Sequence, residues 1–457
     1  MAIEVTGEWQ QQRQQQQQPA AAPGRAQSAA AAAARPAQPP GFVAASIRAS
    51  RATAAAPRAV TVAAGAGGGV VAAAAAAGGA AAQPAAATVV LSYHQPVTST
   101  LTAVFIPIVA AVADGSGAAC PGTAPPRVAM EEVKKAVFAE ASPGAPTVGS
   151  TFNHYGVPWS FEKCDFDDFN GWADVADAEL ARRGVDLSQY KHRVYLLPPS
   201  ACAFVGLAYI GCDGSYDCRS WLAADYWAIP QAIAHELGHN LFMAHAGSSD
   251  TGGGFDEYGD SAGLMGSCCS PRCPNTPHAW QLGWIAPRLL DGGSLPAGQT
   301  LEVSLASQAA TPRSGLRIVP SWAAGVDPIF VGYRTRARGD VGLAPEAARR
   351  VHIHTAAIAN PYDARVTVWR AALGGGADVW EHPASGLVVR LVGAGPSAAA
   401  ITVCRKGGAE TVASCAAGRD NDCNGLVGAG DPACAALLRK RHPRHTPLGK
   451  LPRGRRL

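Results

Sequence analysis

The sequence predicts a mixed α/β (α+β) domain built around one long helix, followed by a β-rich, sandwich-like domain. Two observations support this order. Residues 225–241 read as a long helix that carries histidines at helical spacing, and two shorter amphipathic stretches and a short apolar run precede it. From about Ser294 the chain changes to short alternating runs separated by Gly and Pro, a pattern typical of a β-sandwich.

Residues 1–86 are predicted to be a disordered, low-complexity leader. They contain a glutamine run and long alanine, glycine and proline tracts, which bury too little bulky apolar surface to offset the entropy of ordering the chain. The extreme N-terminus has no basic and apolar signal pattern. Arg48, Arg51 and Arg58, however, precede the stretch 59–113, which has no charged residue. This leader fits either a weak secretory signal behind a misassigned start or a chloroplast transit peptide.

The first ordered domain is expected over residues 87–290. Its predicted elements are one or two strands within 88–113, a helix over 130–142, a helix over 173–184 that ends at Gly184, and a strand over 192–199. The long helix that follows is expected to start stably at Pro230.

The β-rich domain is expected over residues 291–410, followed by a cysteine-bounded segment over 411–438 and a basic tail over 439–457. Its predicted strands are the runs 300–305, 315–320, 328–335, 350–355, 365–370, 386–392 and 400–405.

Charge and cysteine content narrow the class of protein. The tail carries eight Lys and Arg, so removing it from the net charge of +4 leaves the rest at −4. No aromatic residue is interleaved with these charges, so we expect no nucleic-acid partner. Leu101–Ala113 is too short to cross a membrane.

Twelve cysteines, an even count at loop-rich positions, favour disulfides and an oxidising compartment over reduced structural thiols.

The stretch AHELGHNLFMAHAG, residues 234–247, predicts a metal site. His235 and His239 are four residues apart, so they lie on one face of a helix and can hold one metal ion side by side. Glu236 is turned about 100° from His235, which suits a base acting on a water molecule at the metal. His245 can be the third ligand only if the helix breaks soon after His239. Incidental histidines on a core helix are the alternative.

Further motifs favour the metal site. Met265, in the stretch YGDSAGLMGSCC, lies twenty residues past His245. Together these residues resemble the metzincin pattern, three histidines followed by a methionine turn. HELGHNL, YGDSAGLMG, NTPHAWQLGW and the stretch YKHRVYLLPPSACAFVGLAYIG resemble the gametolysin family of green-algal metallopeptidases.

The resemblance implies a metzincin-like catalytic domain and a secreted zinc endopeptidase that digests hydroxyproline-rich glycoproteins of algal wall or matrix. It assigns His235, His239 and His245 as zinc ligands, Glu236 as the general base and Met265 as the turn methionine. Three neutral imidazoles would leave Zn²⁺ an open position, and Glu236 would take the proton of the attacking water. The oligomeric state is left open.

One departure from the pattern concerns the helix break. The metzincin glycine falls at Phe242, and a bulky residue at positive φ costs about 1–2 kcal/mol. Phe242 is therefore expected to weaken zinc affinity or slow catalysis, and Phe242→Gly to relieve strain. A matrix-binding protein that keeps the fold but has lost hydrolysis is the alternative function. No tyrosine follows directly after Met265, so no residue that assists the oxyanion is predicted there.

A second constellation lies in residues 415–434. The oxygens of Asp420, Asp422, Asn424 and Asp431 have the spacing of an EF-hand-like loop, with Gly425 at the sixth position and Asp in place of the usual Glu at the twelfth. The sequence predicts a Ca²⁺ site, and a solvated acidic turn is the alternative.

Overall fold

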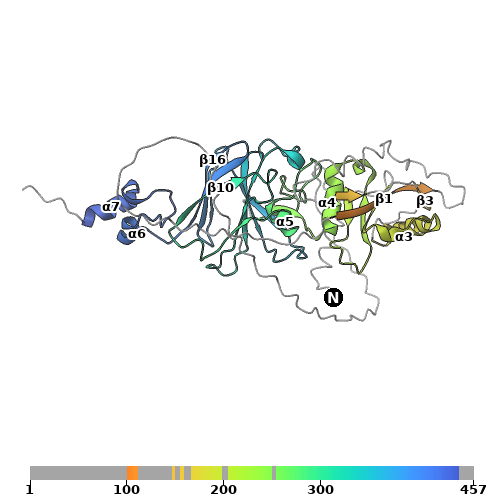
Figure 1. Cartoon of the computed structure of the whole chain (residues 1–457), viewed down its shortest axis with the longest axis horizontal. Coiled ribbons are helices and arrows are strands. Elements are labelled where there is room, and N and C mark those ends of the chain that lie inside the picture. The colour runs from red at the N-terminus through yellow and green to blue at the C-terminus, as the bar shows by residue number, and fades with distance from the viewer. Residues whose placement is uncertain are drawn as a thin grey trace, which may run out of the picture.

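The computed structural model describes residues 100–111, 147–149, 155–158, 166–197, 204–249 and 254–441. Along the long axis, α3 (Phe166–Arg182) and a first sheet lead to α4 (Pro230–Asn240) and then to a β-sandwich (Figure 1). Helices α6 (Val412–Ala416) and α7 (Pro432–Arg441) lie at the far end. The leader, the helix predicted over 130–142 and the end of the basic tail lie outside the described residues. None of the described helices has the length and apolar character needed to cross a membrane.

The first sheet has the strand order β2-β1-β4-β6-β5, with β3 also paired to β1. Strands β1, β4 and β6 run parallel, and β5 joins the edge antiparallel to β6. The strands predicted within 88–113 and 192–199 are confirmed as β1 and β4. The bounds are β1 Thr100–Ala111, β2 Thr147–Gly149, β3 Tyr155–Pro158, β4 His192–Leu196, β5 Gly206–Ala208 and β6 Cys218–Leu222.

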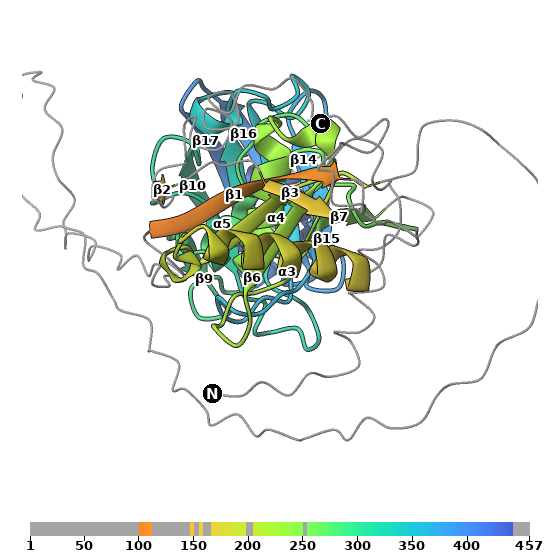
Figure 2. The same cartoon turned by 90° about the vertical axis from the view of Figure 1, so that its right-hand side faces the viewer.

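The side chains of β4 alternate between two hydrophobic cores, because successive side chains of a strand point to opposite faces. Val194 and Leu196 pack with α4, whereas Tyr195 and Leu197 pack with α3. Viewed from the α3 end, α3 crosses in front of this sheet and the sandwich lies behind it (Figure 2). Helix α4 is therefore held between the first sheet and the rest of the molecule.

The second part is built from two sheets with the orders β8-β7-β14-β13-β12-β11-β9 and β10-β17-β16-β15. Val331 and Ile353 of the first of these sheets share one core with Val389 and Val403 of the second. All seven predicted runs form strands. The bounds are β7 Ala246–Ser249, β8 Phe255–Asp256, β9 Arg288–Leu290, β10 Thr300–Ala306, β11 Leu316–Ile318, β12 Ile329–Arg334, β13 Arg350–Ala356, β14 Thr367–Leu373, β15 Val379–His382, β16 Leu387–Ala394 and β17 Ala398–Arg405.

The seven-stranded sheet crosses the predicted boundary near residue 290. Strands β7 and β8 come from the segment just after α4, and β7 pairs in parallel with β14. The strand that follows His245 is thus an integral part of the sandwich.

Candidate metal centre

Helix α4 brings the first two histidines together. Pro230 occupies its first turn, where a missing N–H costs no helical hydrogen bond. His235 and His239 lie one turn apart, with ring centroids separated by 4.8 Å, and both side chains are buried. Their proximity follows from helical geometry alone.

The helix ends in a Schellman motif with Phe242 at the position that usually holds glycine. The Phe242 N–H donates to the His239 carbonyl at 2.9 Å, and the Met243 N–H donates to the Gly238 carbonyl at 3.1 Å. Phe242 has φ +68°, the left-handed conformation that this motif requires. The helix therefore breaks where the metzincin pattern places its glycine, although the residue is aromatic.

Burial of the Phe242 ring offsets the backbone cost. The side chain is 6% exposed, and it packs edge-on against Tyr362 with centroids 5.1 Å apart. It also lies against Gly211, where an added Cβ would overlap the ring. A left-handed residue costs about 1–2 kcal/mol, and burying a phenylalanine contributes about 1.5–3 kcal/mol. The strain that the sequence predicts is present and compensated.

The chain then returns His245 to the other two histidines. Its ring centroid lies 5.4 Å from that of His235 and 4.8 Å from that of His239. One ring nitrogen of each histidine lies within 4.8 Å of the others. The Thr367 N–H of β14 donates to the His245 carbonyl at 3.2 Å, so the sandwich fixes the backbone of this histidine.

The Nδ1 atoms of all three histidines are engaged by acceptors. His235 Nδ1 lies 3.2 Å from the Leu264 carbonyl, His239 Nδ1 2.8 Å from the Met243 carbonyl, and His245 Nδ1 2.5 Å from Glu257 Oε1. A carbonyl oxygen can only accept, so Nδ1 carries the proton in the two helix histidines and leaves the Nε2 lone pair free for a metal.

The two helix histidines are also electrically suited to bind a cation. Burial, followed by the charge of neighbouring histidines, lowers the pKa of His235 to about 3 and the pKa of His239 well below its usual range. Both are therefore neutral at physiological pH, as a metal-ligating imidazole must be. Three imidazoles whose Nδ1 atoms contact oxygen acceptors form a donor set that can hold a divalent metal ion such as Zn²⁺.

Glu236 lies beside this cluster on α4. Its side chain is 4% exposed, and burial raises the pKa of its carboxyl well above the usual value. The carboxylate lies against Gly206 of the edge strand β5, where an added Cβ would overlap it. The backbone of β5 therefore runs directly beside the carboxylate predicted to be the base.

Met265 lies beneath the helix. It is fully buried, and an added Cβ on Gly238 would come 2.7 Å from its sulfur. Its carbonyl accepts from the Ala246 N–H at 2.9 Å, while the neighbouring Leu264 carbonyl accepts from Gln231 of α4 as well as contacting His235. The methionine segment thus supports both α4 and the strand after His245.

Two residues beside the histidines were not found by sequence reasoning. Glu257 holds His245 Nδ1, and the ring of Tyr258 lies 4.3 Å from that of His245. They are turn residues directly after the two-residue strand β8, a segment too short for a periodic pattern that would predict where their side chains point.

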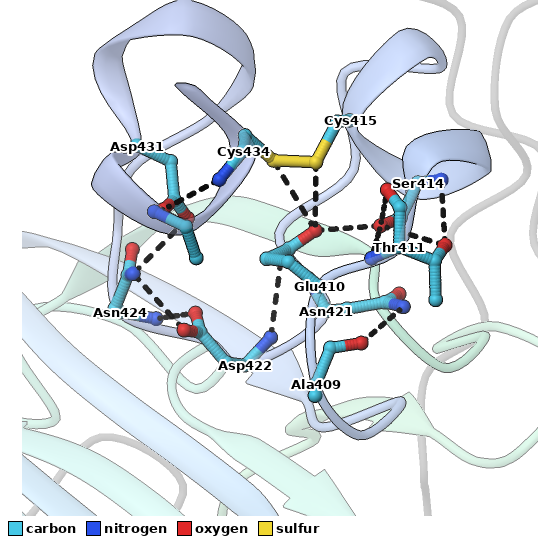
Figure 3. Close-up of a disulfide and its surroundings, with 11 residues drawn as sticks. Ala409, Glu410, Thr411, Ser414, Cys415, Asn421, Asp422, Asn424, Asp431 and Cys434 are labelled. Atoms are coloured by element: carbon cyan, nitrogen blue, oxygen red, sulfur yellow. Dashed lines mark hydrogen bonds between the residues drawn. A yellow bond between two sulfur atoms is a disulfide. The ribbon is translucent and has the colours of Figure 1, made fainter. Parts of the chain in front are cut away.

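The predicted calcium residues form part of a second cluster near the Cys415–Cys434 disulfide (Figure 3). Carboxylate oxygens of Asp422 and Asp431 and of Glu410, which the sequence did not predict, lie within 4.8 Å of one another. Asp420 instead accepts the backbone N–H groups of Asn424 and Gly425 at 3.0 and 2.9 Å.

Asn424 shares in the hydrogen bonds of this loop. Its Nδ2 donates to Asp422 and Asp431 (Figure 3). Its Oδ1 accepts from the Leu426 N–H at 2.7 Å. The structure therefore brings Asp422, Asn424 and Asp431 together, adds Glu410, and uses Asp420 to hold the backbone of the loop.

Two comparisons with known proteins identify the family of the chain. Residues 118–369 match the family described as gametolysin peptidase M11, a range that ends inside β14. The chain is 27% identical over 294 residues to an autolysin of Chlamydomonas reinhardtii. The alignment covers 53% of this chain and 45% of the autolysin, so the chain spans less than half the length of this relative. The match to the family covers more than half of the chain and includes all three histidines, and the chain belongs to the gametolysin peptidase M11 family.

Proposed function

We propose that this protein is a zinc endopeptidase of the metzincin type, with His235, His239 and His245 as the metal ligands. The observation that carries the proposal is the convergence of three buried imidazoles whose Nδ1 atoms already have acceptors. A zinc ion held there would supply Lewis acidity toward a water molecule and toward the scissile carbonyl.

Glu236 acts as the general base. Its carboxylate is next to the histidines and against the edge strand β5. An extended substrate that pairs with this edge would bring its peptide bonds past Glu236. Glu236 would accept the proton of the attacking water and deliver it to the leaving amine.

The conformation of Phe242 supports an active enzyme over a matrix-binding protein without hydrolytic activity. That alternative requires that an aromatic residue at position 242 prevents the helix from ending in the turn that brings His245 back. Phe242 adopts the positive φ and makes both hydrogen bonds of the Schellman motif. The chain therefore turns after α4 in a way that lets His245 reach the other two histidines.

We infer a cell-wall or matrix glycoprotein as the substrate, outside the cell. The related protein of Chlamydomonas reinhardtii is called an autolysin. The Cys404–Cys423 and Cys415–Cys434 disulfides support an oxidising destination, and favour secretion over import into the chloroplast stroma.

We also propose that the C-terminal cluster binds Ca²⁺. Glu410, Asp422 and Asp431 supply hard oxygen donors from three separate points of the chain, which is the donor chemistry that calcium requires. The role of this ion would be structural, because the cluster belongs to the α6–α7 end of the molecule and the histidines to the α4 region (Figure 1).

The test of the endopeptidase function compares wild type with Glu236→Ala on an algal wall glycoprotein. Wild type should cleave it, and the zinc-preferring chelator 1,10-phenanthroline should abolish cleavage. Glu236→Ala should bind zinc with equal stoichiometry but cleave at least about 10²-fold more slowly, since it lacks the base. Glu302→Ala, a change at an exposed residue of β10, is the matched control. Full activity of Glu236→Ala, or zinc-free wild type with full activity, would refute the proposal.

A further inference from the structure

Tyr258 is held in place beside the histidine cluster by its backbone. Its N–H donates to Asp256 Oδ1 at 3.0 Å, and its carbonyl accepts from the Ser267 N–H at 2.9 Å. The first contact belongs to the end of β8 and the second to the segment just after Met265. The position of this residue is therefore set by the same elements that support the site.

The ring of Tyr258 contacts two of the three histidines. Its centroid lies 4.3 Å from that of His245 and 6.4 Å from that of His235, to which it is nearly parallel at 25°. The side chain is 38% exposed. No hydrogen bond joins its hydroxyl to any residue that the structure describes. A partly exposed tyrosine whose hydroxyl has no acceptor among the described residues thus lies beside the histidine cluster.

A donor of this kind would add to the polarisation of the scissile carbonyl that a zinc ion would supply. When water adds to a peptide carbonyl, negative charge develops on the carbonyl oxygen, and a preorganised donor stabilises it. The Nδ1 atoms of the three histidines already contact acceptors on Leu264, Met243 and Glu257. Glu236 is assigned to the proton of the attacking water. These side chains have no hydrogen left to offer the oxyanion.

We propose that Tyr258 is a further catalytic residue, whose hydroxyl donates a hydrogen bond to the carbonyl oxygen of the scissile bond in the transition state. This inference rests on the proposed endopeptidase function. A tyrosine that only packs against the histidines would work equally well as phenylalanine, because Tyr258→Phe keeps the ring and removes only the hydroxyl.

The experiment compares Tyr258→Phe with Tyr362→Phe in the full chain loaded with zinc. Tyr362 is a suitable control because it is also exposed, at 62%, and its ring packs against the turn residue Phe242. Tyr258→Phe should lower kcat about 10²-fold with a change in KM of no more than a few-fold, as expected for the loss of one oxyanion donor. Tyr362→Phe should leave kcat within about two-fold of wild type.

Two binding measurements distinguish a donor from a structural residue. A peptide phosphinate, which carries a tetrahedral group in place of the scissile carbonyl, should bind Tyr258→Phe about 10²-fold more weakly than wild type. The product peptide should bind both equally, and the visible spectrum of the Co²⁺-substituted site should be unchanged. Equal kcat and equal phosphinate affinity in Tyr258→Phe and wild type would overturn the assignment.

Failure of this proposal can be told from failure of the proposed function. A wild type that cleaves the glycoprotein together with a fully active Tyr258→Phe refutes only the role of Tyr258. A wild type that neither cleaves nor binds the phosphinate refutes the endopeptidase itself. An altered Co²⁺ spectrum in Tyr258→Phe would make Tyr258 a residue that positions His245, and would overturn its assignment as a donor.

Discussion

Phe242 contributes to stability in two opposite ways. Its backbone has φ +68°, which disfavours any residue with a Cβ, and its ring fills the space between Gly211 and Tyr362. Removing the side chain therefore relieves strain and creates a cavity at once. The two contributions can be separated by comparing two substitutions at this one position.

Phe242→Gly is expected to lower the free energy of unfolding by about 2 kcal/mol, because the lost ring costs about 3–5 kcal/mol and relief of strain returns about 1–2 kcal/mol. Phe242→Ala removes the same ring but keeps the Cβ, so it should be about 1 kcal/mol less stable than Phe242→Gly. This order is the reverse of that in an ordinary helix. Urea unfolding of the three proteins measures it, and an alanine variant more stable than the glycine variant would contradict the strain at this residue.

Contacts between residues at a fixed spacing on one element could be predicted because they depend only on local geometry. The proximity of His235 and His239 follows from helical spacing, and the break after His239 from the position of His245. Glu257 and Tyr258 could not be found in the same way. Their approach to His245 depends on the β7–β8 hairpin, whose strands are only four and two residues long.

At the level of secondary structure, a buried network joins the methionine segment to the sandwich. Asp260 accepts from His354 of β13 at 3.0 Å and from Asn275 at 2.9 Å, and Asn275 also donates to Thr367 of β14 at 2.7 Å. Asn275 caps α5 (Thr276–Gln281). Burial alone would raise the pKa of Asp260, but the charge of His354 and these hydrogen bonds lower it below the usual value.

Asp260→Asn is expected to lower the free energy of unfolding near neutral pH by about 3 kcal/mol, since it removes a buried carboxylate that accepts from His354 and Asn275. The folded-state pKa of Asp260 is lowered, so its contribution is present above the unfolded-state value near 4 and is lost as the pH falls below it. The difference between wild type and variant should therefore shrink in acid. Asp378→Asn, in an exposed turn, is the control, and a difference that grows in acid would contradict the pairing.

The runs of the sandwich could be predicted from sequence because they are short, rich in apolar and β-branched residues, and separated by Gly and Pro. Strands β7, β8 and β9 could not, since they have two to four residues and little apolar pattern. The parallel pairing of β7 with β14 joins Ala246 to Thr367. No local sequence pattern predicts a pairing strand that lies so far away in the chain.

On the scale of the whole molecule, the α6–α7 segment is tied to the sandwich at its far end. Cys404 of β17 bonds to Cys423 of the acidic loop, and Cys415 of α6 bonds to Cys434 of α7. The loop also packs on the sandwich, where the Asp420 N–H donates to the Gly298 carbonyl at 3.2 Å and the Gly407 N–H to the Asn421 carbonyl at 2.8 Å. The acidic cluster is therefore part of the folded body.

Calcium should bind the full chain with a stoichiometry of one at this cluster and raise its melting temperature, because an ion that binds only the folded state stabilises it. Glu410→Gln should weaken binding at least about 10-fold by removing one charged ligand, while Glu381→Gln on β15 should leave it unchanged. Calorimetry of the zinc-saturated, oxidised protein measures both. A wild type that binds no calcium, or a Glu410→Gln variant with unchanged affinity, would reject this cluster as the site.

The parallel pairing of β7 with β14 has a consequence for the synthesis of the chain. The carbonyl of His245 receives its hydrogen bond from the Thr367 N–H, and synthesis proceeds from the N-terminus at about 5–20 residues per second. For several seconds after His245 has left the ribosome, β7 can pair with β8 but not yet with β14. Assembly of the three-histidine centre thus waits until most of the sandwich has been translated, which delays proteolytic competence inside the cell that makes the protein.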